Sequence, residues 1–199
     1  MHLYVVRHGE TWANAEQRYL GALDPELTVL GRQQAEALGG RLPEALDVII
    51  VSPKLRARET AMILNEERGL PVEIMDCFRE RSVGVFEGLT QAEARERYPG
   101  LWARNITRQW DAAPDGGESI HEIVARVRGG LSELASRYPT NNILLVAHGV
   151  VAKVIRALSK GDFSDFYDWK LSNGSMLALE NFAMTVSDTD ALGISLPQS

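Results

Sequence analysis

Short apolar runs recur along the chain with longer, helix-like segments between them, and this alternation constrains the fold more than any other feature. Four runs are typical of strands, at residues 3–6, 47–52, 71–75 and 142–148. The runs "VIIV" and "ILLVA" are apolar at every position, as expected for strands covered on both faces. Strands that alternate with helices predict an α/β fold with a largely parallel central sheet. Two further candidate strands, 175–180 and 183–187, lie near the C-terminus.

Local signals predict where the helices between these strands begin and end. Candidate N-terminal caps are Thr28, Thr90 with Glu93 three residues later, and Ser119 with Glu122 three residues later. The last two pairs have the spacing of a capping box. Gly69 is expected to end the helix that starts near residue 55, and Pro139 to stop the helix that starts after Ser119.

Size and charge exclude several classes of protein. The chain has 199 residues and no composition shift, so we expect one domain over residues 1–199. A net charge of −6 argues against a nucleic-acid or anionic-membrane partner. The single Cys77 rules out an internal disulfide and is expected to act as a small apolar side chain. Without a signal-peptide pattern or a transmembrane-length apolar run, a cytoplasmic protein is expected.

The ends of the predicted strands carry chemically versatile side chains. Open parallel sheets bind ligands in the crevice beyond the carboxyl ends of their strands. The residues that follow strands here are Arg7, His8 and Gly9, then Ser52, then His148 and Gly149, with Glu80 shortly after the strand at 71–75. If the strands are adjacent and parallel, these residues meet in one pocket.

Five segments resemble signatures of the histidine phosphatase superfamily, also called the phosphoglycerate mutase-like family. They are "RHGETWAN" (7–14), "LTVLGRQQA" (27–35), "RARETA" (56–61), "FRE" with "GVFEG" (78–88) and "VAHG" (146–149). Their order is that of the family, which makes chance agreement very improbable. The resemblance implies a three-layer sandwich with one antiparallel edge strand. It also implies a small helical cap inserted at about 88–118, and phosphoryl transfer through a phosphohistidine.

The chemistry of phosphoryl transfer assigns a role to each of five residues. The reaction needs a nucleophile, cations for the equatorial oxygens and a proton for the leaving group. A neutral imidazole can attack phosphorus, and we assign that role to His8. Arg7 and Arg56 offer guanidinium forks that match phosphate. His148, at a helix start, can donate to the phosphoryl oxygens, and Glu80 is the candidate acid.

Neighbouring residues of the same segments are expected to bind the substrate. They are Gly9, which allows close backbone approach, Glu10, Thr11, Asn14, which adds an amide donor, and Gly149. Glu10, Glu87 and Glu118 are alternative carboxylates for the role given to Glu80.

The segment 88–118 is the candidate for substrate specificity. It is dense in large and cationic side chains, among them Trp102, Arg104, Arg108 and Trp110. In relatives this region resembles a cap over the site, although core packing explains the two tryptophans equally well. The sequence contains no metal-binding spacing, so neither a metal nor another cofactor is expected.

Three functions are compatible with these residues. The favoured one is a phosphomonoesterase that hydrolyses a small soluble phosphate ester. A cofactor-dependent phosphoglycerate mutase is the alternative, although the segment 88–118 is compact and lacks an adjacent arginine pair. A non-catalytic phosphate-binding module is the third. Among phosphatases, the sequence leaves open alpha-ribazole phosphate, sugar phosphates, phosphoglycerate and phosphoserine as substrates, and a homodimer as the assembly.

Overall fold

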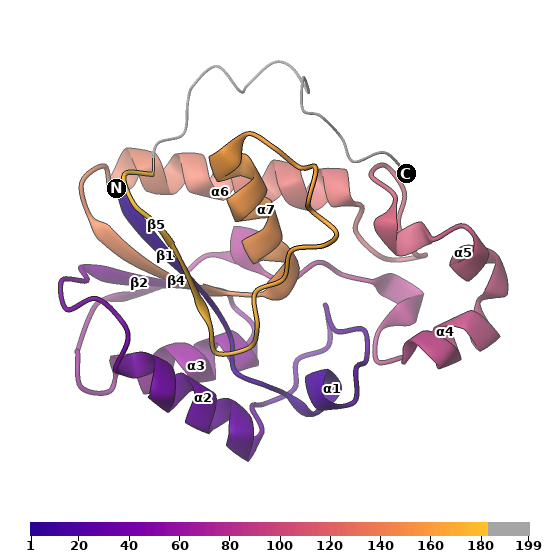
Figure 1. Ribbon diagram of the computed structural model, residues 1–199, viewed down its shortest axis with the longest axis horizontal. Helices are drawn as coiled ribbons and strands as arrows, with labels where there is room; N and C mark the ends of the chain where they lie inside the picture. Colours follow the sequence, from indigo (N-terminus) through magenta and orange to yellow (C-terminus); the bar gives the residue numbers. More distant parts are fainter. Residues whose placement is uncertain (183–199) are drawn as a thin grey trace.

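A five-stranded sheet forms the centre of the computed structural model, which describes residues 1–182 (Figure 1). The strands are β1 (His2–Arg7), β2 (Val48–Val51), β3 (Val72–Ile74), β4 (Asn142–Ala147) and β5 (Met176–Leu179). Their order is β3-β2-β4-β1-β5. The first four are parallel, and β5 pairs antiparallel with β1 at one edge. This confirms the predicted sheet, whereas the candidate strand 183–187 lies outside the described residues.

Helices cover both faces of the sheet, which gives the predicted three layers. In Figure 1, α6 (Ile120–Arg137) and α7 (Gly149–Lys160) lie above the sheet, and α2 (Val29–Gly39) and α3 (Leu55–Asn65) lie below it. Side chains alternate between the two faces along each strand. In β2, Val48 and Ile50 pack with the α6 and α7 side, and Ile49 and Val51 pack with the α2 and α3 side. Burial on both faces accounts for the unbroken apolar runs in the sequence.

Side-chain caps fix the starts of three helices as predicted. The hydroxyl of Thr28 accepts from the N–H of Gly31 at the start of α2. Complete capping boxes begin α6 and α4 (Gln91–Arg97). The end of α3 differs from the prediction, because the helix stops at Asn65 rather than running to Gly69. The Asn65 side chain bonds both the N–H and the C=O of Leu70, which turns the chain early.

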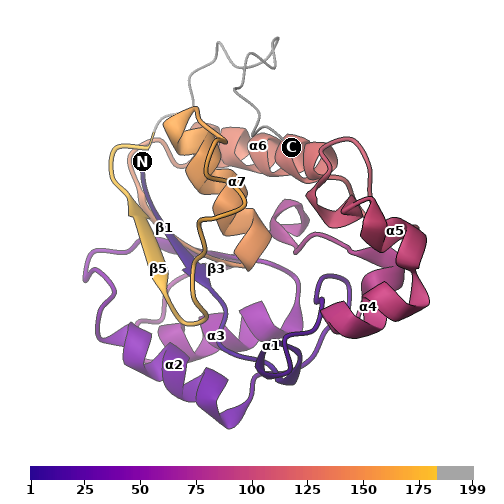
Figure 2. The ribbon, with the colours of Figure 1, turned by 45° about the vertical axis from the view of Figure 1, so that its right-hand side comes forward.

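Short elements make up the part of the molecule beyond one end of the sheet. They are α1 (Trp12–Ala15), η1 (Asp76–Phe78), η2 (Gly84–Phe86), α4, α5 (Pro99–Ala103) and η3 (Ile106–Arg108). Figure 2 shows α1 beside α4. Arg18, just after α1, joins these two regions by donating to Glu93 of α4 and to the carbonyl of Gly88.

Among residues 1–182, the structure contains no helix with the length and apolar character needed to cross a membrane.

Candidate active site

The carboxyl ends of β1, β2 and β4 lie side by side, since these three strands are neighbours and parallel. His8 directly follows β1, Ser52 follows β2, and His148 follows β4 and starts α7. The rings of His8 and His148 have centroids 5.1 Å apart. The predicted meeting of strand ends is therefore present in the fold.

His8 is buried and held in one orientation by both of its ring nitrogens. Its Nδ1 lies 2.7 Å from the carbonyl oxygen of Gly9, which can only accept, so Nδ1 carries the hydrogen. The Nε–H of Arg56 donates to His8 Nε2 at 3.3 Å, so Nε2 is the unprotonated nitrogen of the ring. Burial, and then the charges of Arg56 and Arg7, hold the pKa of His8 well below its usual value. His8 is therefore a neutral imidazole whose unprotonated Nε2 faces Arg56.

Arg56 is fully buried and is anchored by main-chain oxygens. Its Nη1 donates to the carbonyl of Leu23 at 2.7 Å and its Nη2 to that of Gly21 at 3.2 Å. Asp24 provides a carboxylate 3.6 Å from Nη1. The two terminal nitrogens thus donate to the loop 21–23, and the Nε–H is the donor beside His8.

His148 is buried, with one nitrogen bonded and one without a partner. Its Nε2 lies 2.7 Å from the hydroxyl oxygen of Ser52. Its Nδ1 is buried and has no hydrogen-bond partner among the described residues. Burial, Arg56 and His8 hold the pKa of His148 well below its usual value, so this ring is also neutral.

Arg7 and Glu80 lie next to the start of α7. Arg7 Nη1 donates to the carbonyl of Leu171 at 2.8 Å, whereas its buried Nε has no partner among residues 1–182. Glu80 accepts from the N–H of Arg81 at 2.9 Å and from that of Val150, in the first turn of α7, at 3.1 Å. The Glu80 carboxylate therefore lies close to two positive charges, the guanidinium of Arg7 and the partial charge at the N-terminus of α7.

The three alternative carboxylates are engaged elsewhere. Glu118 makes a two-pronged ion pair with Arg126, at 2.6 and 2.7 Å. Glu87 accepts four backbone N–H groups, three of them in the loop 21–23. Glu10 accepts from the hydroxyl of Thr28 at the start of α2. Glu80 is the carboxylate among these four that borders Arg7 and the start of α7.

The remaining residues of the "RHGETWAN" segment mostly shape the loop. A Cβ on Gly9 would come within 2.2 Å of the Gly31 carbonyl oxygen, so the close approach of Gly9 is to α2. The backbone N–H of Glu10 donates to Gln34. Thr11 caps α1 in a capping box with Asn14, whose side chain also borders a cavity of about 300 Å³ beside Arg7.

Gly149 is the first residue of α7 and leaves space in front of the site. A Cβ at this position would lie 3.5 Å from the guanidinium carbon of Arg7 and 3.8 Å from Glu80 Oε2. A larger side chain would therefore narrow the gap between the guanidinium and the carboxylate.

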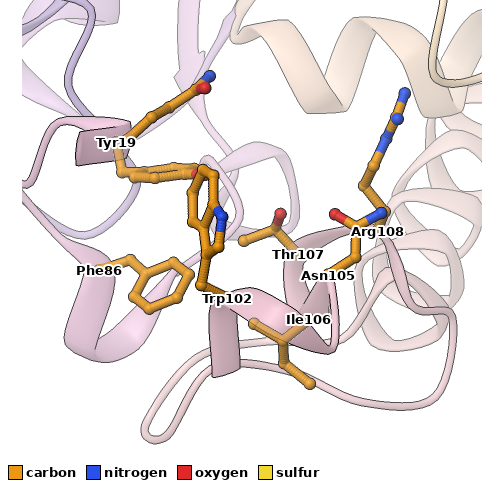
Figure 3. A pocket seen from close by; sticks show the side chains of 8 residues that line it. Tyr19, Phe86, Trp102, Asn105, Ile106, Thr107 and Arg108 are labelled. Atoms are coloured by element: carbon orange, nitrogen blue, oxygen red, sulfur yellow. The ribbon is translucent and has the colours of Figure 1, made fainter. Parts of the chain in front are cut away.

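Trp102 and Arg108 line a second cavity of about 540 Å³, which Figure 3 shows together with Tyr19 and Thr107. The two other predicted specificity residues lie elsewhere. Trp110 packs against Phe163 and Phe166 in the core beside α7, and Arg104 is exposed and does not line the cavity.

Sequence reasoning did not assign roles to several residues that support the site. Ser52 contacts His148, Thr60 accepts from the N–H of Gly9, and Asn173 donates to the carbonyl of His8 and to Asn14. Ser52 had a usable signal, since it is the first polar residue after a buried strand. Asn173 lies 165 residues from His8, and no local pattern in the sequence connects it to the site.

Two further observations concern metals and thiols. Among residues 1–182, no group of three or more His, Cys, Asp or Glu side chains is placed to hold a metal ion. Cys77 is half-buried, and burial raises the pKa of its thiol to about 11. A thiol with a raised pKa is a poor nucleophile at neutral pH.

Comparison with known proteins agrees with the geometry. The family model of the histidine phosphatase superfamily (branch 1) matches residues 3–184. The uncharacterised phosphatase PhoE of Bacillus subtilis is 33% identical over 177 residues, which is 88% of this chain and 86% of that protein. Phosphoserine phosphatase 1 of Hydrogenobacter thermophilus is 34% identical over 175 residues, 87% of this chain and 83% of that protein.

Solved structures give the same result for the fold. The alpha-ribazole phosphatase of Shigella flexneri superimposes with a TM-score of 0.81 at 27% identity, over 92% of this chain and 94% of that one. The chain therefore belongs to the histidine phosphatase superfamily, branch 1.

Proposed function

We propose that this protein is a phosphomonoesterase that hydrolyses a small phosphate ester through a phosphohistidine on His8. The observation that carries the proposal is a set of buried nitrogens around one point. His8 presents the lone pair of Nε2, while Arg7 Nε and His148 Nδ1 are buried without partners in the part of the chain described. Buried nitrogens of this kind are costly unless a ligand meets them, and phosphoryl oxygens have the matching charge.

In the first half of the reaction, His8 Nε2 attacks phosphorus and the bond from phosphorus to the ester oxygen breaks. The Nδ1–H bond to Gly9 holds the ring in place and stabilises the positive charge that the attack produces on it. Arg56 Nε–H, which lies on His8 Nε2 before substrate binds, moves to a phosphoryl oxygen. Arg7 Nε–H binds a second oxygen, and electrostatic stabilisation of this kind is a large part of phosphoryl-transfer catalysis.

His148 supplies a further donor if its proton is on Nδ1. The hydroxyl oxygen of Ser52 already accepts from the N–H of Lys54, at 3.3 Å. The hydroxyl hydrogen is then available for His148 Nε2, which leaves Nδ1 as the N–H that faces the phosphoryl group. A hydrogen bond from the Ser52 hydroxyl to Nε2 favours the tautomer of His148 that can donate through Nδ1.

Glu80 gives its proton to the leaving alkoxide in the first half and takes a proton from water in the second. Water then attacks phosphorus, the bond from phosphorus to His8 Nε2 breaks, and neutral His8 returns with inorganic phosphate as product. The side chain of Glu80 reaches the start of α7, where its Oε2 accepts from the N–H of Val150.

Rapid mixing with a ³²P-labelled ester tests the nucleophile. The protein is expected to form an acid-labile, base-stable phosphoenzyme, and His8→Ala is expected to form none. A label on serine or aspartate contradicts the mechanism. Product analysis in the same experiment separates hydrolysis from isomerisation, because a phosphatase releases inorganic phosphate and a mutase returns an isomeric ester.

Esters with different leaving groups test the role of Glu80. Glu80→Gln is expected to slow alkyl phosphates at least tenfold more than an aryl phosphate, whose phenolate leaves without a proton. Equal losses on both kinds of ester would remove Glu80 from the acid role. Glu118→Gln, which changes a carboxylate that is paired with Arg126, is the matched control.

A further inference from the structure

The cavity next to the phosphate site is much larger than a three-carbon substrate requires. Its volume is about 540 Å³, and it shares Tyr19 and Gln91 with the 300 Å³ cavity that Arg7 and Asn14 border. The two cavities therefore adjoin each other. Cavities of this size hold ligands of drug-like dimensions.

Aromatic rings form one wall of the larger cavity. Tyr19 packs against Phe86 with ring centroids 5.4 Å apart, and both rings line the cavity with Trp102. In Figure 3, Trp102 and Tyr19 lie on one side, Arg108 lies on the opposite side, and Thr107 stands between them. Such rings provide a stacking surface for a planar ligand.

The rest of the lining is mostly polar, apart from Ile106, and carries little charge. Gln91, Asn105 and Thr107 supply amide and hydroxyl groups, and Arg108 is the one charged side chain among the lining residues. The Arg108 guanidinium stacks on Tyr167, 4.7 Å from the ring centre. Aromatic rings with scattered amides suit an uncharged ring better than a second carboxylate or phosphate.

We propose that the natural ester carries a planar ring on its leaving alcohol, and that this ring stacks on Trp102 and Tyr19 while the phosphate sits at His8. This proposal rests on the proposed phosphatase activity and adds the class of leaving group. Trp102 is then a specificity residue that contacts the substrate, besides packing beside Phe86, Leu89 and Ile106.

Matched pairs of substrates test the ring subsite. Adenosine 5′-monophosphate and ribose 5-phosphate are both primary esters, and the first carries an adenine ring that the second lacks. Benzyl phosphate and ethyl phosphate are also primary esters, and the first carries a phenyl ring that the second lacks. We expect kcat/KM to be at least about tenfold higher for the ring-bearing member of a pair, as base stacking on aromatic side chains supports. Equal or lower values for the ring-bearing member in both pairs overturn the proposal.

Variants of Trp102 separate stacking from structural packing. Trp102→Leu keeps an apolar side chain but removes the ring. In this variant we expect the kcat/KM values of the two members of a pair to differ by less than about threefold. Trp102→Phe is expected to retain most of the preference. Trp169→Leu, at a half-buried tryptophan that stacks on Arg156 and does not line the cavity, is the control that should keep the full ratio.

The ratio of kcat/KM for the ring-bearing ester to kcat/KM for the ring-free ester does not change when folded enzyme is lost, because both rates fall by the same factor. A preference that survives in Trp102→Leu overturns the assignment of Trp102. Failure of the underlying activity has a different signature, because no ester of either kind would then label His8 or release phosphate.

Discussion

At the scale of single residues, the buried histidines link the site to the stability of the fold. His8 and His148 have pKa values well below the usual value, with burial as the largest cause. In the unfolded chain their pKa returns to about 6.5, so the unfolded state binds more protons below that pH. The unfolding free energy should therefore fall as pH drops below about 6.5, by up to roughly 1.4 kcal/mol per pH unit for each histidine.

Urea unfolding in phosphate-free buffer, from about pH 7.5 down to about pH 5, measures this slope. His148→Asn removes one of the two titrating groups. We expect it to reduce the slope of the unfolding free energy against pH, below about pH 6.5, by the contribution of up to one proton, roughly 1.4 kcal/mol per pH unit. Carboxylates shared by the two proteins cancel in the comparison. An identical slope in wild type and His148→Asn would mean that His148 is not held neutral by the fold.

Ser52 is a positioning residue, and its effect should pass through His148. Ser52→Ala leaves His148 Nε2 without its partner at 2.7 Å, so the ring is free to place its proton on either nitrogen. We expect kcat to fall about tenfold with little change in KM, because the donor is used in the transition state. Ser52→Thr restores a hydroxyl and should recover part of the rate. A loss confined to KM contradicts this role.

At the scale of elements, helix starts were predictable because their signals are local. The capping boxes at Ser119 and Thr90 each lie within four residues, and both form as expected. The regular helix α3 ends at Asn65, earlier than predicted, and the Asn65 side chain bonds the N–H and the C=O of Leu70. Gly69 still has the left-handed conformation expected just after a helix, with φ +61°, and its N–H donates to the carbonyl of Asn65. Short elements such as α1 and η3 have too few residues to show a period, so tertiary contacts decide them.

The capping box of α6 supports a prediction on stability. Ser119 accepts from the N–H of Glu122 at 3.1 Å, and Glu122 accepts from the N–H of Ser119 at 2.7 Å. Ser119→Ala should lower the unfolding free energy by about 1 kcal/mol. Ser132→Ala, an exposed change of the same kind within the helix, should have almost no effect. Equal effects of the two changes, measured by urea unfolding, would contradict the capping role.

At the scale of the whole molecule, the sequence predicted which residues meet but not what holds them. His8, Ser52 and His148 follow adjacent strands, so topology alone brings them together. The side-chain hydrogen bonds that support the site join distant parts of the chain. Asn173 donates to the carbonyl of His8, and Arg18 donates to the carboxylate of Glu93. A side chain that bonds backbone 60 or more residues away leaves no periodic signal in the sequence. The partners of such long-range hydrogen bonds are identified only in the folded structure.

Glu87 is connected to His8 through a series of hydrogen bonds that includes Arg56. Its carboxylate accepts from the N–H groups of Gly21, Ala22 and Leu23, at 3.0, 2.7 and 3.3 Å. The carbonyls of Gly21 and Leu23 in turn hold the two terminal nitrogens of Arg56. Arg56 then directs its Nε–H at His8. Three successive contacts therefore connect the carboxylate of Glu87 to His8.

Glu87→Gln should consequently impair catalysis as well as stability. The amide keeps one acceptor oxygen but loses the charge and one acceptor, so the loop 21–23 loosens and the unfolding free energy falls by about 1–2 kcal/mol. Because a displaced Arg56 cannot bind the phosphoryl oxygens in the transition state, phosphoenzyme formation should slow at least about fivefold in protein that is still folded. Glu96→Gln, an exposed carboxylate on α4, is the matched control and should leave both quantities unchanged. Single-turnover labelling beside urea unfolding measures the two effects together. A destabilised Glu87→Gln protein with a normal labelling rate would show that the loop supports the fold without positioning Arg56.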